Sequence, residues 1–296
     1  MPILDAKPKV AVLLAAYQGR EWINEQVTSI LSQELVDVTL YISVDLSTDG
    51  TYEWCVDLSR MNNNVYVLDY GEKFGGAAKN FFRLIRDVDF SGYDYVSLSD
   101  QDDIWLTKKI YHAIELIKMN HYDACSSDVI AFWGDGRERL VKKSYPQKKL
   151  DYHFEAAGPG CTYVFTSCSL VDFKVFILEN FDEVYDVALH DWLIYAYFRH
   201  GNYKWCIDAV PLMFYRQHAG NQVGFNFGIE AYIRRLFKIR NKWYRREVIK
   251  INNLLMKSKH SELTLNYWFL VNNFWQLRRR TRDAFVLLLM IVFGFF

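Results

Sequence analysis

The feature that most constrains the fold is a regular alternation of strand-length apolar runs with helical patterns in the first hundred residues. Four runs have the length and composition of strands: "KVAVLLAAY" (9–17), "DVTLYISVD" (37–45), "NVYVLDY" (64–70) and "YDYVSLSD" (93–100). Helical patterns separate them, including the apolar series Trp22, Ile23, Val27, Ile30, Leu31 and the segment "GAAKNFFRLIRDV" (76–88). Strands and helices that alternate in this way form right-handed βαβ units. The sequence therefore predicts an α/β fold with a Rossmann-like, mostly parallel central sheet flanked by helices.

An acidic cluster, "SLSDQDDIW" (97–105), directly follows the fourth predicted strand. In open α/β sheets, ligands bind at the carboxyl ends of the strands. This rule predicts that the turn Ala16-Tyr17-Gln18, Asp45 and the 100–103 cluster lie on one rim. Like charges this close repel each other, so the cluster needs either full solvation or a cation.

Two interpretations of the cluster remain open at this point. In an extended segment Asp100 and Asp102 project to the same side while Gln101 points away, and this pair could hold Mg²⁺ together with substrate phosphates. Alternatively, Asp102 or Asp103 caps a helix that starts in "IWLTKKIYHAIELIK" (104–118). In the same way, Ser47 or Thr48 could cap the helix that follows "LSTDGT".

The second half of the chain is less regular and ends in a basic, aromatic tail. Strand patterns occur in "YDACSSDVIAFW", "CTYVFT" and "YKWCIDAVPLMFY", the last with a break at Pro211, and helical patterns in "SLVDFKVFILEN" and "HDWLIYAYFRH". Residues 229–296 have a helical period, and positions 229–283 contain fourteen Lys/Arg against four Asp/Glu, although the whole chain has 35 of each. This asymmetry indicates that the tail meets something anionic, either nucleic acid or phospholipid headgroups. We expect the headgroups and no nucleic acid.

The C-terminal segment "RRRTRDAFVLLLMIVFGFF" places a cationic cluster before thirteen uncharged, mostly apolar residues. Because a spanning helix needs about 20 such residues, we expect a monotopic membrane anchor. In that case Arg278, Arg279, Arg280 and Arg282 would lie at anionic headgroups. The alternative is a terminal helix that docks on the core or is buried in a dimer, so an oligomer remains open.

Five cysteines, Cys55, Cys125, Cys161, Cys168 and Cys206, form no C-x-x-C pair. Neither a zinc site nor a disulfide framework is indicated, and a reducing compartment fits best. The segment "MPILDAKPKV" lacks the pattern of a secretory signal. We therefore expect a cytoplasmic protein, peripheral to the inner face of the plasma membrane.

Seven ordered segments resemble the family 2 glycosyltransferases, inverting enzymes of the GT-A fold, and especially their bacterial rhamnosyltransferase-like branch. These segments are "VAVLLAAYQGREWINEQVTSILSQ", "ISVDLSTDGT", "GAAKNFFRLI", "LSDQDDIW", "GPGCTYVF", "HDWL" and "YRQHAGNQVG". The resemblance covers roughly residues 9–225 and keeps the motif order. It implies a GT-A domain over residues 1–228, with a nucleotide-binding half at about 9–120 and an acceptor half at about 121–228, followed by a helical tail at 229–296.

The resemblance also implies roles for single residues. Ala16, Tyr17 and Asp45 would contact the base and ribose of the nucleotide. Asp100 would lie near the ribose and metal, and Asp102 would ligate the Mn²⁺ or Mg²⁺ that bridges the diphosphate. Asp191 in "HDW" would be the catalytic base, and His218 would lie beside the diphosphate or metal. The family usually has acidic residues at both positions of Val44-Asp45 and a glycine at Leu46, so this chain departs from the pattern next to Asp45.

Each of these residues also has a structural interpretation. Asp191 could simply lie near a helix N-terminus, where the helix dipole favours it. His218 could be a hydrogen-bonded structural histidine, and Lys79, one turn into a Gly-rich helix start, could reach phosphate or be a solvated lysine. Trp105 and Trp192 are expected to pack behind the acidic cluster and behind Asp191, or else to stack on a sugar ring.

The resemblance predicts a metal-dependent transferase that moves one sugar from dTDP-rhamnose or a UDP-hexose to a hydroxyl of a surface glycan of the O-antigen or capsule type. The acceptor would be a growing glycan or one linked to a polyprenyl diphosphate. A divalent cation would neutralise the departing diphosphate, and a carboxylate would take the proton of the attacking hydroxyl. Two alternatives are a sugar nucleotidyltransferase, which would leave Asp191 without a role, and a non-catalytic GT-A-like binding subunit, for which Val44 and Leu46 are the hints.

Overall fold

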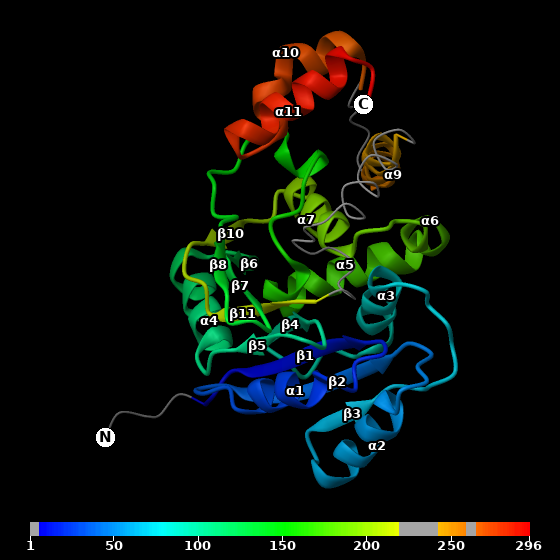
Figure 1. The fold of residues 1–296 in the computed structure, drawn as a ribbon, viewed down its shortest axis with the longest axis vertical. Coiled ribbons are helices and arrows are strands. Elements are labelled where there is room, and N and C mark those ends of the chain that lie inside the picture. Colours follow the sequence, from blue (N-terminus) through cyan, green and yellow to red (C-terminus); the bar gives the residue numbers. More distant parts are fainter. Residues whose placement is uncertain (1–5, 219–241, 259–264) are drawn as a thin grey trace.

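A seven-stranded sheet forms the centre of the molecule. The structure is a computed structural model that describes residues 6–218, 242–258 and 265–296 (Figure 1). The strand order is β10-β6-β9-β4-β1-β2-β3, and only β9 runs antiparallel to its neighbours. The strands are β1 (Lys9–Ala16), β2 (Asp37–Val44), β3 (Val65–Val67), β4 (Tyr95–Ser99), β6 (Ala124–Ser127), β9 (Val164–Thr166) and β10 (Trp205–Asp208). The predicted mostly parallel sheet is confirmed.

A smaller four-stranded sheet has the order β5-β11-β7-β8. It consists of β5 (Ile104–Trp105), β7 (Val129–Trp133), β8 (Glu138–Val141) and β11 (Met213–Gln217). Two segments that read as single strands divide between the sheets: "YDACSSDVIAFW" forms β6 and β7, and the chain before and after Pro211 forms β10 and β11. The sequence pattern could not show this division, because each part is apolar enough to be a strand in either sheet.

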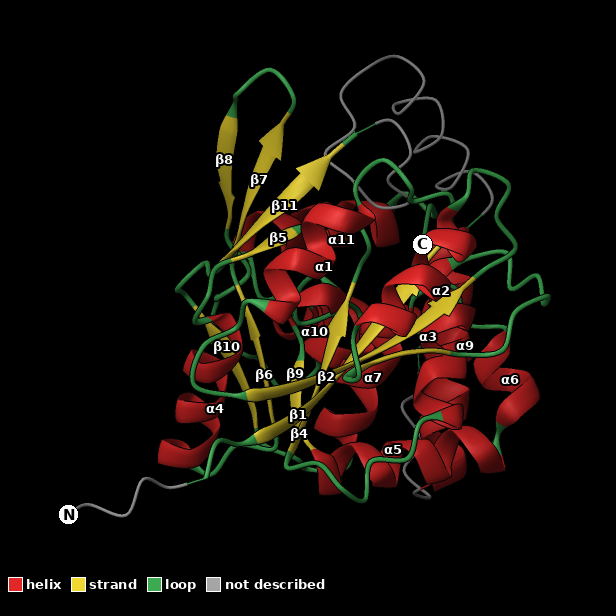
Figure 2. Ribbon diagram, turned by 90° about the horizontal axis from the view of Figure 1, so that it is seen from below, coloured by secondary structure: helices red, strands yellow, loops and turns green. Residues whose placement is uncertain are grey.

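Helices cover both faces of the large sheet (Figure 2). The helices are α1 (Ile23–Leu31), α2 (Thr51–Met61), α3 (Ala77–Asp87), α4 (Lys109–Asn120), α5 (Ser167–Glu179), α6 (Phe181–Tyr185), α7 (His190–His200), α9 (Trp243–Ser258), α10 (Tyr267–Leu277) and α11 (Thr281–Val292), with single 3₁₀ turns at Asp151–His153 and Gly160–Thr162. The β1 side chains alternate between two cores. Leu13 packs with α3, α5 and α7, whereas Leu14 packs with α1 and α4. A strand buried on both faces must be apolar throughout, as β1 is.

The structure contradicts both helix-cap interpretations. Helix α2 begins after Gly50, whose φ of +85° lies in the left-handed region that favours glycine, and not after Ser47 or Thr48. The segment after the acidic cluster is the short strand β5, and α4 begins only at Lys109. Asp102 and Asp103 therefore cap no helix.

The described part of the tail packs on the same core as α3, α5 and α7. Leu255 of α9, Leu277 of α10 and Ile291 of α11 are buried in that cluster, together with Phe296. Among the described residues, no helix has the length and apolar character required to cross a membrane. The helical prediction for 229–241 and 259–264, and the part of "YRQHAGNQVG" after His218, lie outside the described residues.

Two of the four arginines that were expected at a membrane surface bind other parts of the protein instead. Arg279 is 5% exposed, with Nη1 3.2 Å from Asp151 Oδ2 and Nη2 donating to the carbonyl oxygen of Ala156. Arg278 is half-buried and donates to the carbonyl oxygen of Phe154. The headgroup prediction is therefore wrong for Arg278 and Arg279, because this turn between α10 and α11 binds the protein itself.

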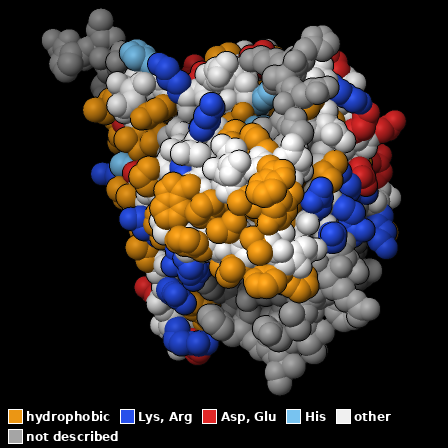
Figure 3. Space-filling view, turned by 90° about the horizontal axis from the view of Figure 1, so that it is seen from above, with side chains coloured by type: hydrophobic (Ala, Val, Ile, Leu, Met, Phe, Trp, Pro, Cys, Tyr) orange, Lys and Arg blue, Asp and Glu red, His pale blue; other side chains and the backbone are white. Residues whose placement is uncertain are grey.

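The outer face of α10 and α11 is apolar. Large side chains that are exposed there gather on one surface flanked by lysine and arginine (Figure 3). They are Tyr267, Trp268, Trp275, Phe285, Val286, Leu289, Val292, Phe293 and Phe295. The C-terminal segment thus docks on the core with one face, as the alternative interpretation stated, and presents a second apolar face outward.

Candidate active site

A cleft of about 840 Å³ lies where β1, β2 and β4 end. The strand register aligns Ala16 with Val44, and Leu14 with Ser99, so the three chain ends leave the sheet at the same edge. The volume is within the range of pockets for small molecules and cofactors. The lining includes Ala16, Tyr17, Asp45, Lys73, Asn80, Asp100, Gln101, Asp102, Lys143, Gly160, His190, Asp191, Trp192, Tyr215, His218, Tyr244 and Arg278. The structure thus brings together every predicted site residue except Lys79.

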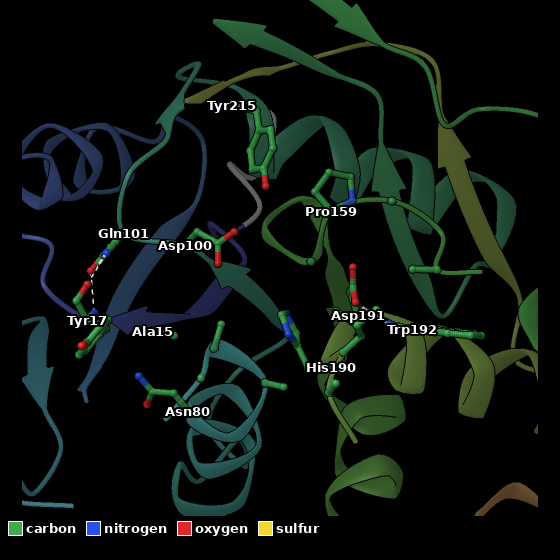
Figure 4. A pocket seen from close by; sticks show the side chains of 18 of the residues that line it. Ala15, Tyr17, Asn80, Asp100, Gln101, Pro159, His190, Asp191, Trp192 and Tyr215 are labelled. Atoms are coloured by element: carbon green, nitrogen blue, oxygen red, sulfur yellow. Dashed lines mark hydrogen bonds between the residues drawn. The ribbon is translucent and has the colours of Figure 1, made fainter. Parts of the chain in front are cut away.

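The Tyr17 turn is held by Gln101. Gln101 accepts a hydrogen bond from the Tyr17 backbone N–H and donates one to the Tyr17 carbonyl oxygen, both at 2.7 Å (Figure 4). A side chain at Gly19 would displace this amide, since a Cβ there would lie 2.0 Å from Gln101 Oε1. Gln101 therefore faces the cleft and positions the turn, contrary to the expectation that it points away.

Asp45 has a structural role in addition to its place in the cleft, and Lys79 lies outside the cleft lining. Asp45 is buried, and its carboxylate accepts from the backbone N–H groups of Leu46, Phe74 and Gly75. It lines the cleft and also holds the loop before α3. Lys79 is exposed, points toward the Tyr185 ring and does not line the cleft. Its position supports the solvated-lysine interpretation, and Lys73 is the lysine that the loop before α3 places in the lining.

Some residues of the acidic cluster face the cleft and form its front, and others lie behind them and form its back. Asp100, Asp102 and His218 line the cleft, with His218 Nε2 2.7 Å from Asp102 Oδ2. Asp103 and Cys161 lie behind them. The ligand atoms of Asp100, Asp103 and Cys161 are within 4.8 Å of one another, and burial raises the pKa of the Cys161 thiol well above its usual range. A neutral thiol is a poor ligand for a hard cation, so the oxygen and nitrogen donors at the front are the better set.

The donor types of these front residues suit a divalent cation, although among the described residues only Asp100, Asp103 and Cys161 bring their ligand atoms within 4.8 Å of one another. Burial and the neighbouring Asp102 raise the pKa of Asp100 to about 7. Burial and the charges of Asp102 and Asp100 raise the pKa of Asp103 well above its usual range. Asp103 Oδ2 is buried without a hydrogen-bond partner among the described residues. The protein alone therefore leaves this cluster short of positive charge, which a cation beside Asp100 and Asp102 would supply.

Arg216 and Lys109, which the sequence analysis missed, offset part of the negative charge of the acidic cluster. Arg216 donates its backbone N–H to Asp103 Oδ1 and its side-chain Nε–H to the Asp102 carbonyl oxygen. Lys109 is buried behind the cluster with Nζ 3.6 Å from the centre of the Trp105 ring, and burial lowers its pKa to about 8 although Asp103 and Cys161 favour its charged form. Trp105 thus packs behind the acidic cluster, as expected.

Asp191 stands on the opposite wall of the cleft from Asp100 (Figure 4). It is the second residue of α7, and its Oδ1 accepts from the Trp192 backbone N–H at 2.8 Å. Burial raises the pKa of Asp191 to about 6, while the Trp192 N–H and the positive charge of Lys143 oppose that rise. Trp192 is buried behind it and donates Nε1–H to the Tyr152 carbonyl oxygen, as expected for a packing residue.

Two further cleft residues are held by tight packing. His190 stacks on Phe81 at 4.1 Å between ring centroids, and burial lowers its pKa to about 3, so the ring is neutral. A Cβ at Gly160 would lie 2.4 Å from His190 Nε2. Asn80 donates to the carbonyl oxygens of Ala16 and Ser43 and thereby ties the ends of β1 and β2. "GPGCTYVF", "HDWL" and "GAAKNFFRLI" contained these residues, but no single residue type in them indicated this role.

An α/β sheet with an acidic cluster at its carboxyl edge and a second carboxylate across the cleft defines the GT-A class of glycosyltransferases. The chain belongs to glycosyltransferase family 2: residues 11–178 match the family described as Glycosyl transferase family 2. It is a glycosyltransferase of the rhamnosyltransferase-like type, since it is 45% identical to dTDP-rhamnosyl transferase RfbG of Shigella flexneri over 96% of this chain and 100% of that protein.

More distant proteins agree at the level of family and fold. A putative teichuronic acid biosynthesis glycosyltransferase, TuaG of Bacillus subtilis, is 29% identical over 38% of this chain and 42% of its own length. The solved structure of S. aureus TarS 1-349 in complex with UDP-GlcNAc superposes with a TM-score of 0.53 and 14% identity, covering 96% of this chain and 81% of that one. The predicted GT-A fold is confirmed.

Proposed function

We propose that this protein is a metal-dependent, inverting transferase that moves rhamnose from dTDP-rhamnose to a hydroxyl of a lipid-linked or growing surface glycan. The observation that carries the proposal is the placement of the Asp102–His218 pair and Asp191 in one cleft. The 45% identity to a dTDP-rhamnosyl transferase over 96% of this chain supports the donor, with a UDP-hexose as the second candidate. A relative named as acting on a diphosphoundecaprenol-linked sugar, WfaP of Escherichia coli, 26% identical over 37% of this chain, supports the lipid-linked acceptor.

The front of the acidic cluster would bind the donor diphosphate. Asp100, Asp102 and His218 would hold Mn²⁺ or Mg²⁺, which neutralises the charge that develops on the departing diphosphate. Gln101 orients the Tyr17 turn and Asn80 holds Ala16, so the nucleotide meets a preformed wall. Asp45 stabilises the loop before α3 on the same side.

Asp191 would act as the general base. Its carboxylate faces the cleft from the wall opposite Asp100, so it can take the proton of an acceptor hydroxyl that attacks from the side away from the diphosphate. One displacement with one base inverts the anomeric centre. A nucleotidyltransferase would leave Asp191 without a role, and a non-catalytic subunit would leave both carboxylate sites without one.

Nucleotide binding and turnover test the proposal separately. We expect dTDP to raise the melting temperature in the presence of Mn²⁺ or Mg²⁺ but much less in EDTA, with about 2.7 kcal/mol of stabilisation at 100 times its dissociation constant. Asp191→Asn should retain this shift and lose about 10²–10⁴-fold in kcat. Asp182→Asn, an exposed aspartate of α6, is the matched control. Full activity of Asp191→Asn would contradict the assignment of the base.

The apolar face of α10 and α11 would rest on an anionic membrane surface, at the inner face of the plasma membrane. Its flanking cations favour anionic headgroups, and the five free thiols suit a reducing compartment. Leu289→Asp with Phe293→Asp should reduce cosedimentation with vesicles of anionic phospholipid at least tenfold. Met119→Asp changes an exposed apolar residue of α4 and should not reduce it. Unchanged cosedimentation, or a dimer that the double variant dissociates, would assign the face to a protein contact instead.

A further inference from the structure

We propose that Lys143 and Arg278 form a second anion-binding site in the cleft, beyond Asp191, and that this site holds the phosphate group of the acceptor. The inference rests on the proposed glycosyl transfer, because it assigns the remaining part of the same cleft to the second substrate. Both side chains line that cleft, although 135 positions separate them in the sequence.

The backbone on both sides of Lys143 is anchored. Asp128, which is 1% exposed at the junction of β6 and β7, accepts from the backbone N–H of Lys143 at 2.5 Å and from that of Ser144 at 2.8 Å. The other carboxylate oxygen accepts from the Ser144 hydroxyl. The Lys143 stem lies beside Gly158, at 3.5 Å from where a Cβ of that glycine would be. The lysine is therefore held in place by its backbone and stem and not by its charge.

The ammonium group of Lys143 has no hydrogen bond or ion pair within the part of the chain that the structure describes. Burial and the positive charges of Arg279 and Arg278 lower the pKa of Lys143, and Glu155 and Asp191 offset this only partly. Lys143 is half-buried, and an ammonium group near two guanidinium groups without a paired carboxylate is stabilised by an incoming anion.

Arg278 is oriented in a similar way. Its Nη1 donates to the Phe154 carbonyl oxygen at 2.8 Å and to the Tyr244 hydroxyl at 3.0 Å. The Nε–H has no hydrogen-bond partner among the described residues, and Glu155 Oε2 is 3.6 Å away. Glu155 therefore offsets part of its charge, as Asp151 offsets that of the adjacent Arg279 in the core. Nη2 of Arg278 makes no hydrogen bond among the described residues and can bind an oxyanion in the cleft.

Asp191 lies across the cleft from Asp100 (Figure 4), and the positive charge of Lys143 acts on it. Arg278 lines the same cleft, and its charge acts on Lys143. The reacting hydroxyl of the acceptor would lie at Asp191, and its phosphate would lie at Lys143 and Arg278. The acceptor would therefore have its phosphate close to the hydroxyl that reacts. A sugar attached directly to a lipid diphosphate has this arrangement.

Inorganic pyrophosphate in EDTA is the probe, because without a divalent cation the Asp100 and Asp102 carboxylates repel it. Calorimetric titration should show binding to the wild-type protein and at least tenfold weaker binding to Lys143→Met. Lys143→Arg should retain the affinity, and Lys142→Met, which changes the exposed neighbouring lysine, should not alter it. The dissociation constant of dTDP with Mg²⁺ should stay within about twofold in Lys143→Met.

Three results would overturn the inference: no pyrophosphate binding to the wild type, equal binding to Lys143→Met, or an equal loss of dTDP affinity, which would assign Lys143 to the donor. Failure of the proposed function gives a different pattern. In that case dTDP would not bind with Mg²⁺ to any variant, whereas the pyrophosphate titrations would still report on Lys143. A melting curve of Lys143→Met that matches the wild type excludes misfolding as the cause.

Discussion

The Asp102 carboxylate and the His218 imidazole lie 2.7 Å apart in the lining of the cleft, although 116 positions separate them. Trp22 stacks on the His218 ring at 3.9 Å between centroids, so the imidazole is held from a third segment of the chain. A carboxylate oxygen and an imidazole nitrogen that are fixed in this way can move onto one cation with little rearrangement.

Removing the imidazole should weaken cation-dependent nucleotide binding. We expect His218→Asn to lower the affinity for dTDP with Mn²⁺ by about 10–100-fold, as for other residues that orient a metal ligand, and to leave the weak binding in EDTA unchanged. His112→Asn is a matched control, because His112 Nε2 lies 2.8 Å from Asp208 in a second His–Asp pair away from the cleft. Equal effects of the two substitutions on calorimetric titrations would contradict the role of His218.

The turnover rate should rise with pH through about 6. Burial raises the pKa of Asp191 to about 6, and only the ionised carboxylate can accept the hydroxyl proton, so kcat should fall about tenfold per unit below that value. The profile is measured at saturating donor and cation, which keep the carboxylates of the acidic cluster ionised. Lys143→Met removes a positive charge that lowers this pKa and should move the acid limb to higher pH. A flat profile between pH 5 and 7 would argue against Asp191 as the base.

A methyl group at Gly160 should displace His190. The added Cβ would lie 2.4 Å from Nε2 of a ring that is stacked on Phe81 and cannot swing away freely. We expect Gly160→Ala to destabilise the protein by about 1–3 kcal/mol in urea unfolding and to lower kcat at least tenfold. Gly158→Ala, two positions earlier, would meet its nearest atoms at an ordinary 3.5 Å and should be tolerated. The reverse order of these effects would refute the packing argument.

The tail should prove integral to the stability of the catalytic core. Arg279→Met removes a buried partner of Asp151 and should lower the free energy of unfolding by about 3–5 kcal/mol, because a buried carboxylate loses part of its compensation. Arg280→Met, at the next position, is more exposed and should change it by about 0.5 kcal/mol or less. Urea melts of the two variants give the comparison, and similar midpoints would mean that the tail docks independently of this ion pair.

The sequence by itself determined the parallel sheet and the rim of its ligand edge. Buried strands such as β1 must be apolar along their whole length, and parallel strands end at a common edge, so Tyr17, Asp45 and Asp100 could be placed together from local patterns alone. Asp191 and His218 were assigned from motif resemblance, since nothing in their local sequence requires them to face that edge.

Only the tertiary structure decided which side chains complete the cleft. Gln101 was expected to point away, but it turns toward the backbone of Tyr17, which lies across the rim. Arg278 and Arg279 read as a surface cluster and are instead drawn to the Phe154 carbonyl oxygen and the Asp151 carboxylate. These contacts join segments far apart in the chain, and their free energy depends on burial and on partners that no local pattern records.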